Sequence, residues 1–288
     1  MASGGGAKGC DIYHAGEYNV TKKEQQFVET VWEYYRRHGR LRLPWRRTKN
    51  PYRIFVSEIM LQQTQVERVL PKYTAFLKTF PTLTSLASAS LGDVLRAWQG
   101  LGYNRRAKML HTCAQTVVHT YGGKFPCTQS ELMKLPGIGH YTAGAVMAFA
   151  FGESVSIIET NIRTVYIHHF FHDDTDVLDA DIQKIIERTL DTTNPREWYY
   201  ALMDYGAFLK KKIGNQNARS KHYTKQSTFK NSDRQIRGAI LRLLSERTYT
   251  RKKMHETLPF EIDRIDAQSE RLVEEGMIVY MRKKYTLP

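Results

Sequence analysis

Hydrophobic residues recur with the three- and four-residue spacing of helices over most of the chain. The segment 21–39 shows this first. Thr21 and Glu24 have the spacing of a capping box, in which each side chain satisfies a backbone N–H group of the other residue. The apolar stripe behind this cap consists of Phe27, Val28, Val31, Trp32 and Tyr35. The segment is therefore predicted to be an amphipathic helix with one buried face.

The helical spacing continues to about residue 211, and prolines and glycines mark the expected breaks. No alternation typical of β-strands is evident before residue 276. The body of the chain is therefore predicted to be all-α. The expected helical segments are 52–80, 82–102, 105–123, 128–152, 179–190 and 198–211, punctuated by Pro71, Pro81, Gly100, Gly102 and Gly122–Gly123.

A basic, polar stretch then separates this body from a differently patterned C-terminus. Three short helices, within 234–247, 250–258 and 266–278, are followed by the alternating sequence VYMRKKYTL. Three helices followed by a hairpin are the order of a winged helix, a helix-turn-helix variant. A generic small helical cap is the alternative.

These patterns predict an order of domains along the chain. A flexible leader precedes a helical core, and a basic linker joins the core to a winged-helix-like domain. The core is expected to have two lobes, of which the first contains six helices. The predicted bounds are 1–20 for the leader, 21–222 for the core (first lobe about 50–150, second lobe 21–49 with 151–222), 223–232 for the linker and 233–288 for the C-terminal domain.

Composition narrows the class of partner. Of the 288 residues, 41% are hydrophobic, and no apolar stretch approaches the roughly 20 residues of a membrane span. The net charge is +14, and residues 210–288 hold 19 basic and 9 acidic side chains. Such an excess favours a polyanion such as nucleic acid. A basic surface that serves only solubility is the alternative.

Targeting and redox signals are modest. The start, MASGGGAKGC, lacks the apolar core of a secretory signal. Cys10, Cys113 and Cys127 are too scattered for a zinc site or a disulfide framework. A cytoplasmic monomer is therefore expected, with nucleoid association if the source is bacterial.

The sequence LPGIG at 135–139 is the clearest backbone signal. Glycines at 137 and 139 allow a sharp turn and a close approach to a partner. The helix that follows presents free N–H groups at its positive end, which suits a phosphate. An ordinary turn between helices is the alternative.

Two glutamates stand out by their surroundings. Glu58 lies in the apolar sequence YRIFVSEIMLQQTQ, where loss of solvation is expected to keep a carboxyl protonated towards neutral pH. Glu159 follows the apolar run that ends at Ile158. One protonated acid and one ionised carboxylate are the pair that cleaves glycosidic bonds through an oxocarbenium-like transition state. A buried glutamate satisfied by a neighbouring arginine or helix end is the alternative for Glu58.

Several stretches between Pro44 and Val165 resemble the MutY-type adenine DNA glycosylases of the helix-hairpin-helix (HhH-GPD) superfamily, in the same order and spacing. They are PWR, VSEIMLQQTQV, FPTLTSLASA, GLGYNRRAKMLH, GGKFP and LPGIGHYTAGAVMAFAFG. The resemblance implies a two-lobed glycosylase fold that binds double-stranded DNA. It also implies that Glu58 protonates adenine N7, that Glu159 stabilises the sugar cation, and that Tyr141 and Asn161 position the reacting groups.

The resemblance implies further site residues. Backbone carbonyls of the hairpin would hold a monovalent cation, K⁺ or Na⁺, at Met133, Leu135 and Ile138. The side chains of Gln62, Gln63, Thr64 and Tyr103 would contact the duplex or wedge into it around the flipped base. The other expected DNA-binding residues are Arg46, Gly137, Gly139, His140, Lys210, Lys211 and Lys212.

The sequence departs from the family pattern at four places. Glu159 stands where the family usually has aspartate. Tyr141 replaces the lysine that forms a Schiff base in members that also cut the strand, so a monofunctional enzyme without lyase activity is expected. No cysteines follow ALMDYGAFL, so an iron–sulfur cluster is not expected. The C-terminal part is shorter than the family's opposite-base domain.

The predicted function is therefore base excision repair by a monofunctional DNA glycosylase that releases adenine from a mispair. Two alternatives stay open. The first is an enzyme of the same fold that acts on a modified adenine or on mismatched thymine or uracil, which the glutamate at position 159 favours. The second is a non-catalytic DNA-binding protein that uses the winged helix.

Overall fold

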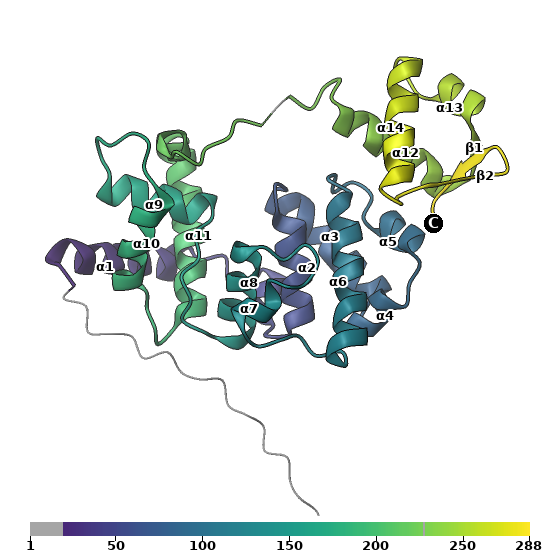
Figure 1. Cartoon of the computed structure of the whole chain (residues 1–288). Helices are drawn as coiled ribbons and strands as arrows, with labels where there is room; N and C mark the ends of the chain where they lie inside the picture. The colour runs from purple at the N-terminus through teal and green to yellow at the C-terminus, as the bar shows by residue number, and fades with distance from the viewer. Residues whose placement is uncertain (1–19, 227) are drawn as a thin grey trace, which may run out of the picture. The chain divides into compact units, whose positions relative to one another are not determined.

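The computed structural model describes residues 20–226 and 228–288. The predicted leader, with Cys10, lies outside the described residues except for Val20. The described part divides into two compact units (Figure 1). The first unit contains the described residues up to Arg42 together with Pro126–Lys134 and Gly139–Tyr223. The second unit contains Leu43–Phe125, Leu135–Ile138 and Thr224–Pro288.

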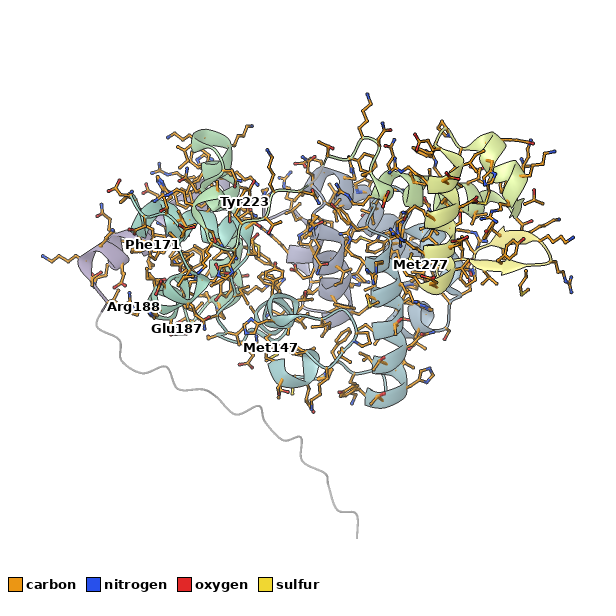
Figure 2. All side chains as sticks on the ribbon, turned by 45° about the horizontal axis from the view of Figure 1, so that its top comes forward. Met147, Phe171, Glu187, Arg188, Tyr223 and Met277 are labelled. Atoms are coloured by element: carbon orange, nitrogen blue, oxygen red, sulfur yellow. The ribbon has the colours of Figure 1, made fainter. Side chains whose placement is uncertain are left out.

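The first unit is built from helices. Its longest helix, α11, packs against both α1 and α9. A π-helical turn, Met147–Phe151, continues α8 (Met147 is labelled in Figure 2). The helices are α1 (Lys22–His38), α7 (Gln129–Leu132), α8 (His140–Val146), α9 (Thr160–Phe170), α10 (Asp179–Thr189) and α11 (Pro195–Ile213), followed by the 3₁₀ turn Gln216–Arg219.

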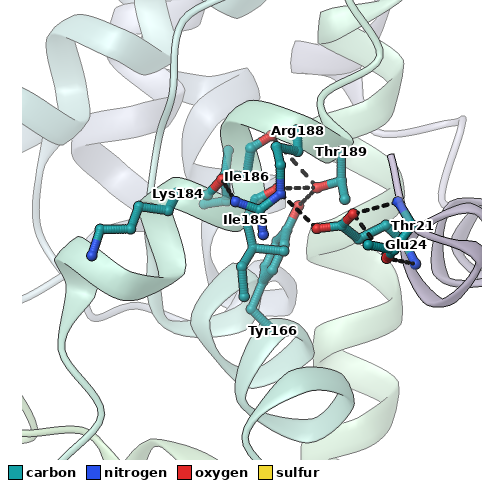
Figure 3. Close-up of polar contacts among 8 residues, drawn as sticks. All are labelled: Thr21, Glu24, Tyr166, Lys184, Ile185, Ile186, Arg188 and Thr189. Atoms are coloured by element: carbon teal, nitrogen blue, oxygen red, sulfur yellow. Dashed lines mark hydrogen bonds and ion pairs between the residues drawn. The ribbon is translucent and has the colours of Figure 1, made fainter. Parts of the chain in front are cut away.

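The capping box predicted at the start of α1 is confirmed. The Glu24 backbone N–H donates to Thr21 Oγ1 over 3.2 Å, and the Thr21 N–H donates to Glu24 Oε2 over 2.8 Å. Arg188 Nε of α10 donates to Glu24 Oε1 over 2.7 Å (Figure 3). The cap therefore also ties α1 to α10, and the same close-up shows the hydroxyls of Tyr166 and Thr189 in contact beside it.

The second unit combines a helical part with a C-terminal module, which we define as residues 233–288. The helical part contains a 3₁₀ turn, Pro44–Arg47, and the helices α2 (Pro51–Leu61), α3 (Val66–Thr79), α4 (Leu83–Ala87), α5 (Leu91–Ala97) and α6 (Arg105–Tyr121). The module contains α12 (Asp233–Glu246), β1 (Tyr249–Thr250), α13 (Arg251–Thr257), α14 (Ile262–Glu274), β2 (Val279–Met281) and β3 (Lys284–Thr286).

The order of elements in the module is that of a winged helix, as predicted. Its small antiparallel sheet has the strand order β1-β3-β2. In this sheet Tyr285 pairs with Tyr249 on one side and with Tyr280 on the other. The sequence pattern missed β1, because two residues are too few to show an alternation.

The expected break at Pro71 is wrong, because this proline lies inside α3. The chain breaks instead at residues 62–65, between α2 and α3. Proline removes one backbone hydrogen bond from a helix interior. Burial of Val69, Tyr73 and Phe76 against the rest of the unit offsets that loss.

The C-terminal module packs against α5 and α6 (Figure 1). The Gly92 N–H donates to the Pro288 carbonyl over 3.1 Å, and a Cβ at Gly92 would lie only 2.5 Å from that oxygen. Met277, labelled in Figure 2, is fully buried at the base of the module. The module is therefore an integral part of the second unit. None of the described helices is long and apolar enough to cross a membrane.

Candidate active site

Glu58 lies in the last turn of α2, in the second unit. The helix starts at Asn50, whose side chain accepts the Arg53 N–H over 3.1 Å, with Pro51 in the first turn. Every residue from Ile54 to Met60 is buried, and Glu58 is only 6% exposed. The prediction that Glu58 lies in a buried helix among apolar residues is therefore confirmed. Burial of this kind disfavours the charged form of a carboxyl.

Arg106, which the sequence patterns did not single out, holds the C-terminal end of α2. Its Nη1 donates to the carbonyls of Ile59 over 2.8 Å and Met60 over 3.0 Å, and also to that of Gln62. The last carbonyls of a helix have no partners within it, and a cation satisfies them well. Burial lowers the pKa of Arg106 to about 10, which leaves it charged at neutral pH.

The same guanidinium joins two loops that are distant in the sequence. Its Nη2 donates to Thr64 Oγ1 over 3.0 Å and to the carbonyls of Leu101 and Gly102 over 3.2 Å each. The predicted DNA contacts after α2 and before α6 are thereby brought to one place. Only the tertiary structure shows this role, because Arg106 and its α2 partners are more than 40 residues apart.

Both loops contain a residue in a conformation that is uncommon outside glycine. The backbone φ angle is +54° at Gln63 and +47° at Tyr103. Together with Gln62, these two side chains line a pocket of about 490 Å³ in the second unit. Strained backbone of this kind clusters at ligand-binding and catalytic sites. Three of the predicted DNA-contacting side chains therefore share one pocket.

The hairpin turn is fixed by close packing. Gly137 has a φ angle of +76°, and a Cβ there would lie 2.6 Å from Cβ of Met109 in α6. Leu135 and Ile138 are buried, and the Ile138 N–H donates to the Leu135 carbonyl over 3.2 Å. The turn thus needs glycine at 137 because of its positive φ angle and the close approach of α6, whereas the expected approach to a binding partner stays a prediction. Gly139 then caps α8, which starts at the exposed His140.

In the first unit, the segment before Glu159 is anchored at two points. Tyr199 of α11 donates its hydroxyl to the Val155 carbonyl over 2.6 Å and accepts the Ile157 N–H over 3.2 Å. A Cβ at Gly144 of α8 would lie 2.3 Å from Cγ2 of Ile157. The chain therefore reaches Glu159 along a fixed path, supported by α8 and α11.

Glu159 is the N-cap of α9, and its side chain folds back over the helix start. Oε1 accepts the N–H of Asn161 over 2.8 Å and that of Ile162 over 2.9 Å, while Oε2 accepts Nδ2 of Asn161 over 3.2 Å. All three donors and the positive end of α9 favour the carboxylate. This folded conformation accommodates the methylene by which glutamate is longer than aspartate.

Two opposing effects act on the pKa of Glu159. Loss of solvation raises the pKa above its usual range, while the amide hydrogen bonds and the charge of Arg163 act to lower it, and the net direction is upward. Arg163 is itself paired with Asp179 through two bonds of 2.7 Å. The charge on Glu159 therefore depends on its hydrogen-bond donors.

A glycine of α11, Gly206, packs against the backbone of Asn161. A Cβ at Gly206 of α11 would lie 2.2 Å from the Asn161 carbonyl oxygen, so the backbones of α9 and α11 are in direct contact. This close approach fixes the Glu159–Asn161 pair relative to α11. Tyr141 lies half-buried in the first turn of α8.

The remaining predicted residues lie on the surface or at element ends. Arg46 is half-buried on the 3₁₀ turn Pro44–Arg47, and Met133 is 45% exposed after α7. Lys210, Lys211 and Lys212 form the last turn of α11, where cations are favourable. The described residues contain no group of three His, Cys, Asp or Glu side chains that could hold a metal ion.

The first unit thus presents a carboxylate held by helix amides, and the second presents a carboxyl buried in an apolar helix. The two carboxyls therefore lie in surroundings of different kinds. The sequence found both acids through their apolar neighbours. It missed Arg106 because nothing local distinguishes that arginine from Arg105.

Part of the chain is similar to known proteins of base excision DNA repair. Residues 56–191 match the family described as HhH-GPD superfamily base excision DNA repair protein. An adenine DNA glycosylase of Buchnera aphidicola subsp. Baizongia pistaciae is 37% identical over 187 residues, which cover 64% of this chain and 52% of that protein. The adenine DNA glycosylase of Mycolicibacterium smegmatis is 42% identical over 174 residues, which cover 59% of each chain.

Two solved structures of DNA glycosylases and repair enzymes share the fold of this chain. A thermostable thymine-DNA glycosylase matches with a TM-score of 0.57 and 26% identity, over 65% of this chain and 87% of that one. Endonuclease III in a trapped covalent DNA intermediate shares the fold, with a TM-score of 0.54 and 19% identity, over 73% of this chain and 91% of that one.

The chain spans little more than half the length of the adenine DNA glycosylases that it matches. The matched region nevertheless includes Glu58, the hairpin and Glu159. The matched region contains the helix–turn–helix formed by α7, the LPGIG turn and α8, and it is similar to the HhH-GPD superfamily of base excision DNA repair proteins.

Proposed function

We propose that this protein is a monofunctional DNA glycosylase that flips a base out of duplex DNA and hydrolyses its N-glycosidic bond, with adenine in a mispair as the target. The observation that carries the proposal is the contrast between the two acids. Glu58 is buried in an apolar helix, whereas Glu159 is held by three N–H donors at a helix start. The adenine DNA glycosylases among its relatives support adenine as the base.

Each acid has one role in the proposed reaction. Glu58 gives its proton to adenine N7 as the C1′–N9 bond breaks, and the bonding electrons leave with the base. Glu159 stabilises the positive charge that develops on the sugar, and water adds to C1′. The flipped base must leave the stack before this chemistry starts. The hairpin carbonyls of Met133, Leu135 and Ile138 would hold K⁺ or Na⁺ near the DNA backbone.

The segment after α11, where the family resemblance would place an iron–sulfur cluster, is held by contacts of protein side chains. Asn217 Nδ2 donates to Thr164 Oγ1 over 2.7 Å and to the Thr160 carbonyl over 2.9 Å. Arg219 Nη2 donates to the Asp174 carbonyl over 2.8 Å. These contacts support the proposal that the protein folds and acts without a cluster.

The test is single-turnover release of free base from a panel of duplexes. Adenine opposite guanine or 8-oxoguanine should be released, and the Glu58→Gln variant should release none. Release of thymine or uracil in place of adenine would favour the alternative of an enzyme with the same fold and another target base. Two observations point to that alternative, namely the similarity to a thymine-DNA glycosylase and the glutamate at position 159. Binding of the duplexes without release of any base would indicate a non-catalytic DNA-binding protein.

Lyase activity is tested separately with borohydride. Residue 141 is tyrosine, and a phenol cannot form the imine that borohydride traps. No covalent protein–DNA complex should appear on denaturing gels. A trapped complex would mean that another amine attacks the sugar, and the monofunctional assignment would then be wrong.

A further inference from the structure

The pocket beside Gln63 and Tyr103 is completed by the C-terminal module. Arg234 and Arg237 of α12 line it together with Arg105 and Arg106 of α6. The guanidinium of Arg234 lies 5.2 Å from the centroid of the Tyr103 ring and donates to its hydroxyl. Residues more than 130 positions apart therefore form one wall.

The charge around the pocket is one-sided. Of the side chains that line it, four are arginines and none is acidic. Glu275 contacts two of these arginines, at 2.6 Å from Arg237 Nη2 and 3.8 Å from Arg105 Nε. The lining side chains themselves are basic or uncharged, and arginine forks match the geometry of phosphate oxygens.

The helix that a winged helix ordinarily places in the DNA major groove is α14. Here α14 contains four acidic and two basic residues. Such a surface repels the DNA backbone, so α14 is poorly suited to contact it. The basic residues that face the core site come instead from α12, the first helix of the module.

The module also contacts the strained residues of the core. Gln226, just before the module, donates to the Tyr103 hydroxyl and, over 3.1 Å, to Gln63 Oε1. Arg234 reaches the same hydroxyl. The C-terminal segment therefore contacts both side chains with positive φ angles, and Arg106 also lies against one of them, the Tyr103 ring.

We propose that the Arg234–Arg237 face of α12 is a DNA-contact surface, and that the pocket it completes binds a phosphate–sugar unit of the same duplex that the core engages. The volume of about 490 Å³ exceeds that of a phosphate alone and suits a phosphate with its sugar. This inference rests on the proposed function for its ligand. It assigns to the module a role that the acidic α14 cannot fill.

The first experiment measures the affinity for an undamaged duplex at several salt concentrations. Arg237→Gln and Arg234→Gln should each lower the slope of log K against log salt by about one unit. Arg242→Gln is the matched control, because Arg242 is exposed on the same helix and outside the pocket. Equal slopes for Arg237→Gln and Arg242→Gln would overturn the inference.

A second variant removes the competing acid. Glu275→Gln frees Arg237 and Arg105 from their carboxylate and should tighten duplex binding several-fold. Tightening that disappears in the Glu275→Gln/Arg237→Gln double variant supports the pocket, because contacting residues are energetically coupled. Weaker binding by Glu275→Gln, with an unchanged melting temperature, would contradict it.

A third experiment uses duplexes in which a single linkage is a neutral methylphosphonate. At one position this substitution should weaken duplex binding by the wild-type protein and leave duplex binding by the Arg237→Gln variant unchanged. If free deoxyadenosine monophosphate binds the pocket and no linkage position shows this effect, the pocket is a nucleotide site and the inference fails. None of these readouts requires base release, so a protein that binds in this way and releases no base would contradict the proposed function alone.

Discussion

Glu58 and Glu159 are side chains of one kind in opposite surroundings. Glu58 lies in the last turn of α2 among buried apolar residues of the second unit. Glu159 begins a helix of the first unit and accepts two backbone N–H groups and one side-chain amide. Burial acts on both carboxyls, but only Glu159 is held by the N–H groups of a helix start, and the proposed roles of the two acids depend on this difference.

The two units also support their acids in different ways. The second unit uses a single buried arginine, Arg106, to fix the end of α2 and two loops. The first unit uses close backbone packing, with Gly144 against Ile157 and Gly206 against Asn161. Support by hydrogen bonds from a charged arginine and support by close steric contact should respond differently to mutation.

The largest effect is expected at Glu58. Glu58→Gln keeps the shape of the side chain and removes its transferable proton, so single-turnover base release should fall by about 10²–10⁴-fold, the usual cost of losing a general acid. Duplex binding should stay within a few-fold. Glu67→Gln, at an exposed acid of the same unit, is the control and should leave the rate unchanged. An unaltered rate in Glu58→Gln would remove Glu58 from the mechanism.

The next effect is expected at Glu159. Glu159→Gln retains an oxygen for the α9 amides but loses the charge, and the rate should fall by about 10²-fold, as for other electrostatic stabilisers of a transition state. Glu159→Asp should also be slower than wild type, because the shorter side chain no longer reaches the Asn161 and Ile162 amides in the same way. An Asp variant faster than wild type would show that the pocket suits the family's usual residue.

The stability of Glu159→Gln should move in the opposite direction from its activity. The raised pKa means that the folded protein holds this proton more tightly than the unfolded chain does. The stability contributed by the group is therefore complete at low pH and is lost as the pH rises through the raised pKa. Thermal melts at pH 7 should show an unchanged or higher Tm. A clear loss of Tm would mean that the folded state favours the charged form.

The smallest effect is expected at Arg106, which acts through other residues. Arg106→Lys keeps the charge but cannot reach six acceptors, so about 2 kcal/mol of unfolding free energy should be lost. Base flipping, followed by 2-aminopurine fluorescence at saturating DNA, should slow by roughly tenfold, since small misplacement of binding groups is costly. Arg242→Lys, at an exposed arginine of the same unit outside the pocket, should change neither. Loss of stability with normal flipping would make Arg106 merely structural.

Much of this arrangement could be predicted from local sequence. The Thr21–Glu24 box, the glycine at 137 and the helix–hairpin order of the module all depend on residues close to one another in the chain. Pro71 was misleading because tertiary packing outweighs one lost hydrogen bond. The roles of Arg106 and Arg234 depend on partners 40 or more residues away. The pattern of one segment carries no signal for contacts of that kind.

The most direct test of the central claim is the pH dependence of single-turnover base release in wild type and in Glu159→Gln. If one acid must be protonated and the other charged, the wild-type profile is bell-shaped, and its acid limb lies above the usual glutamate range because desolvation raises the pKa of Glu159. In Glu159→Gln the acid limb should disappear from the residual rate. A wild-type rate without a bell, or an acid limb that persists in Glu159→Gln, would contradict the assignment of the two glutamates to opposite roles.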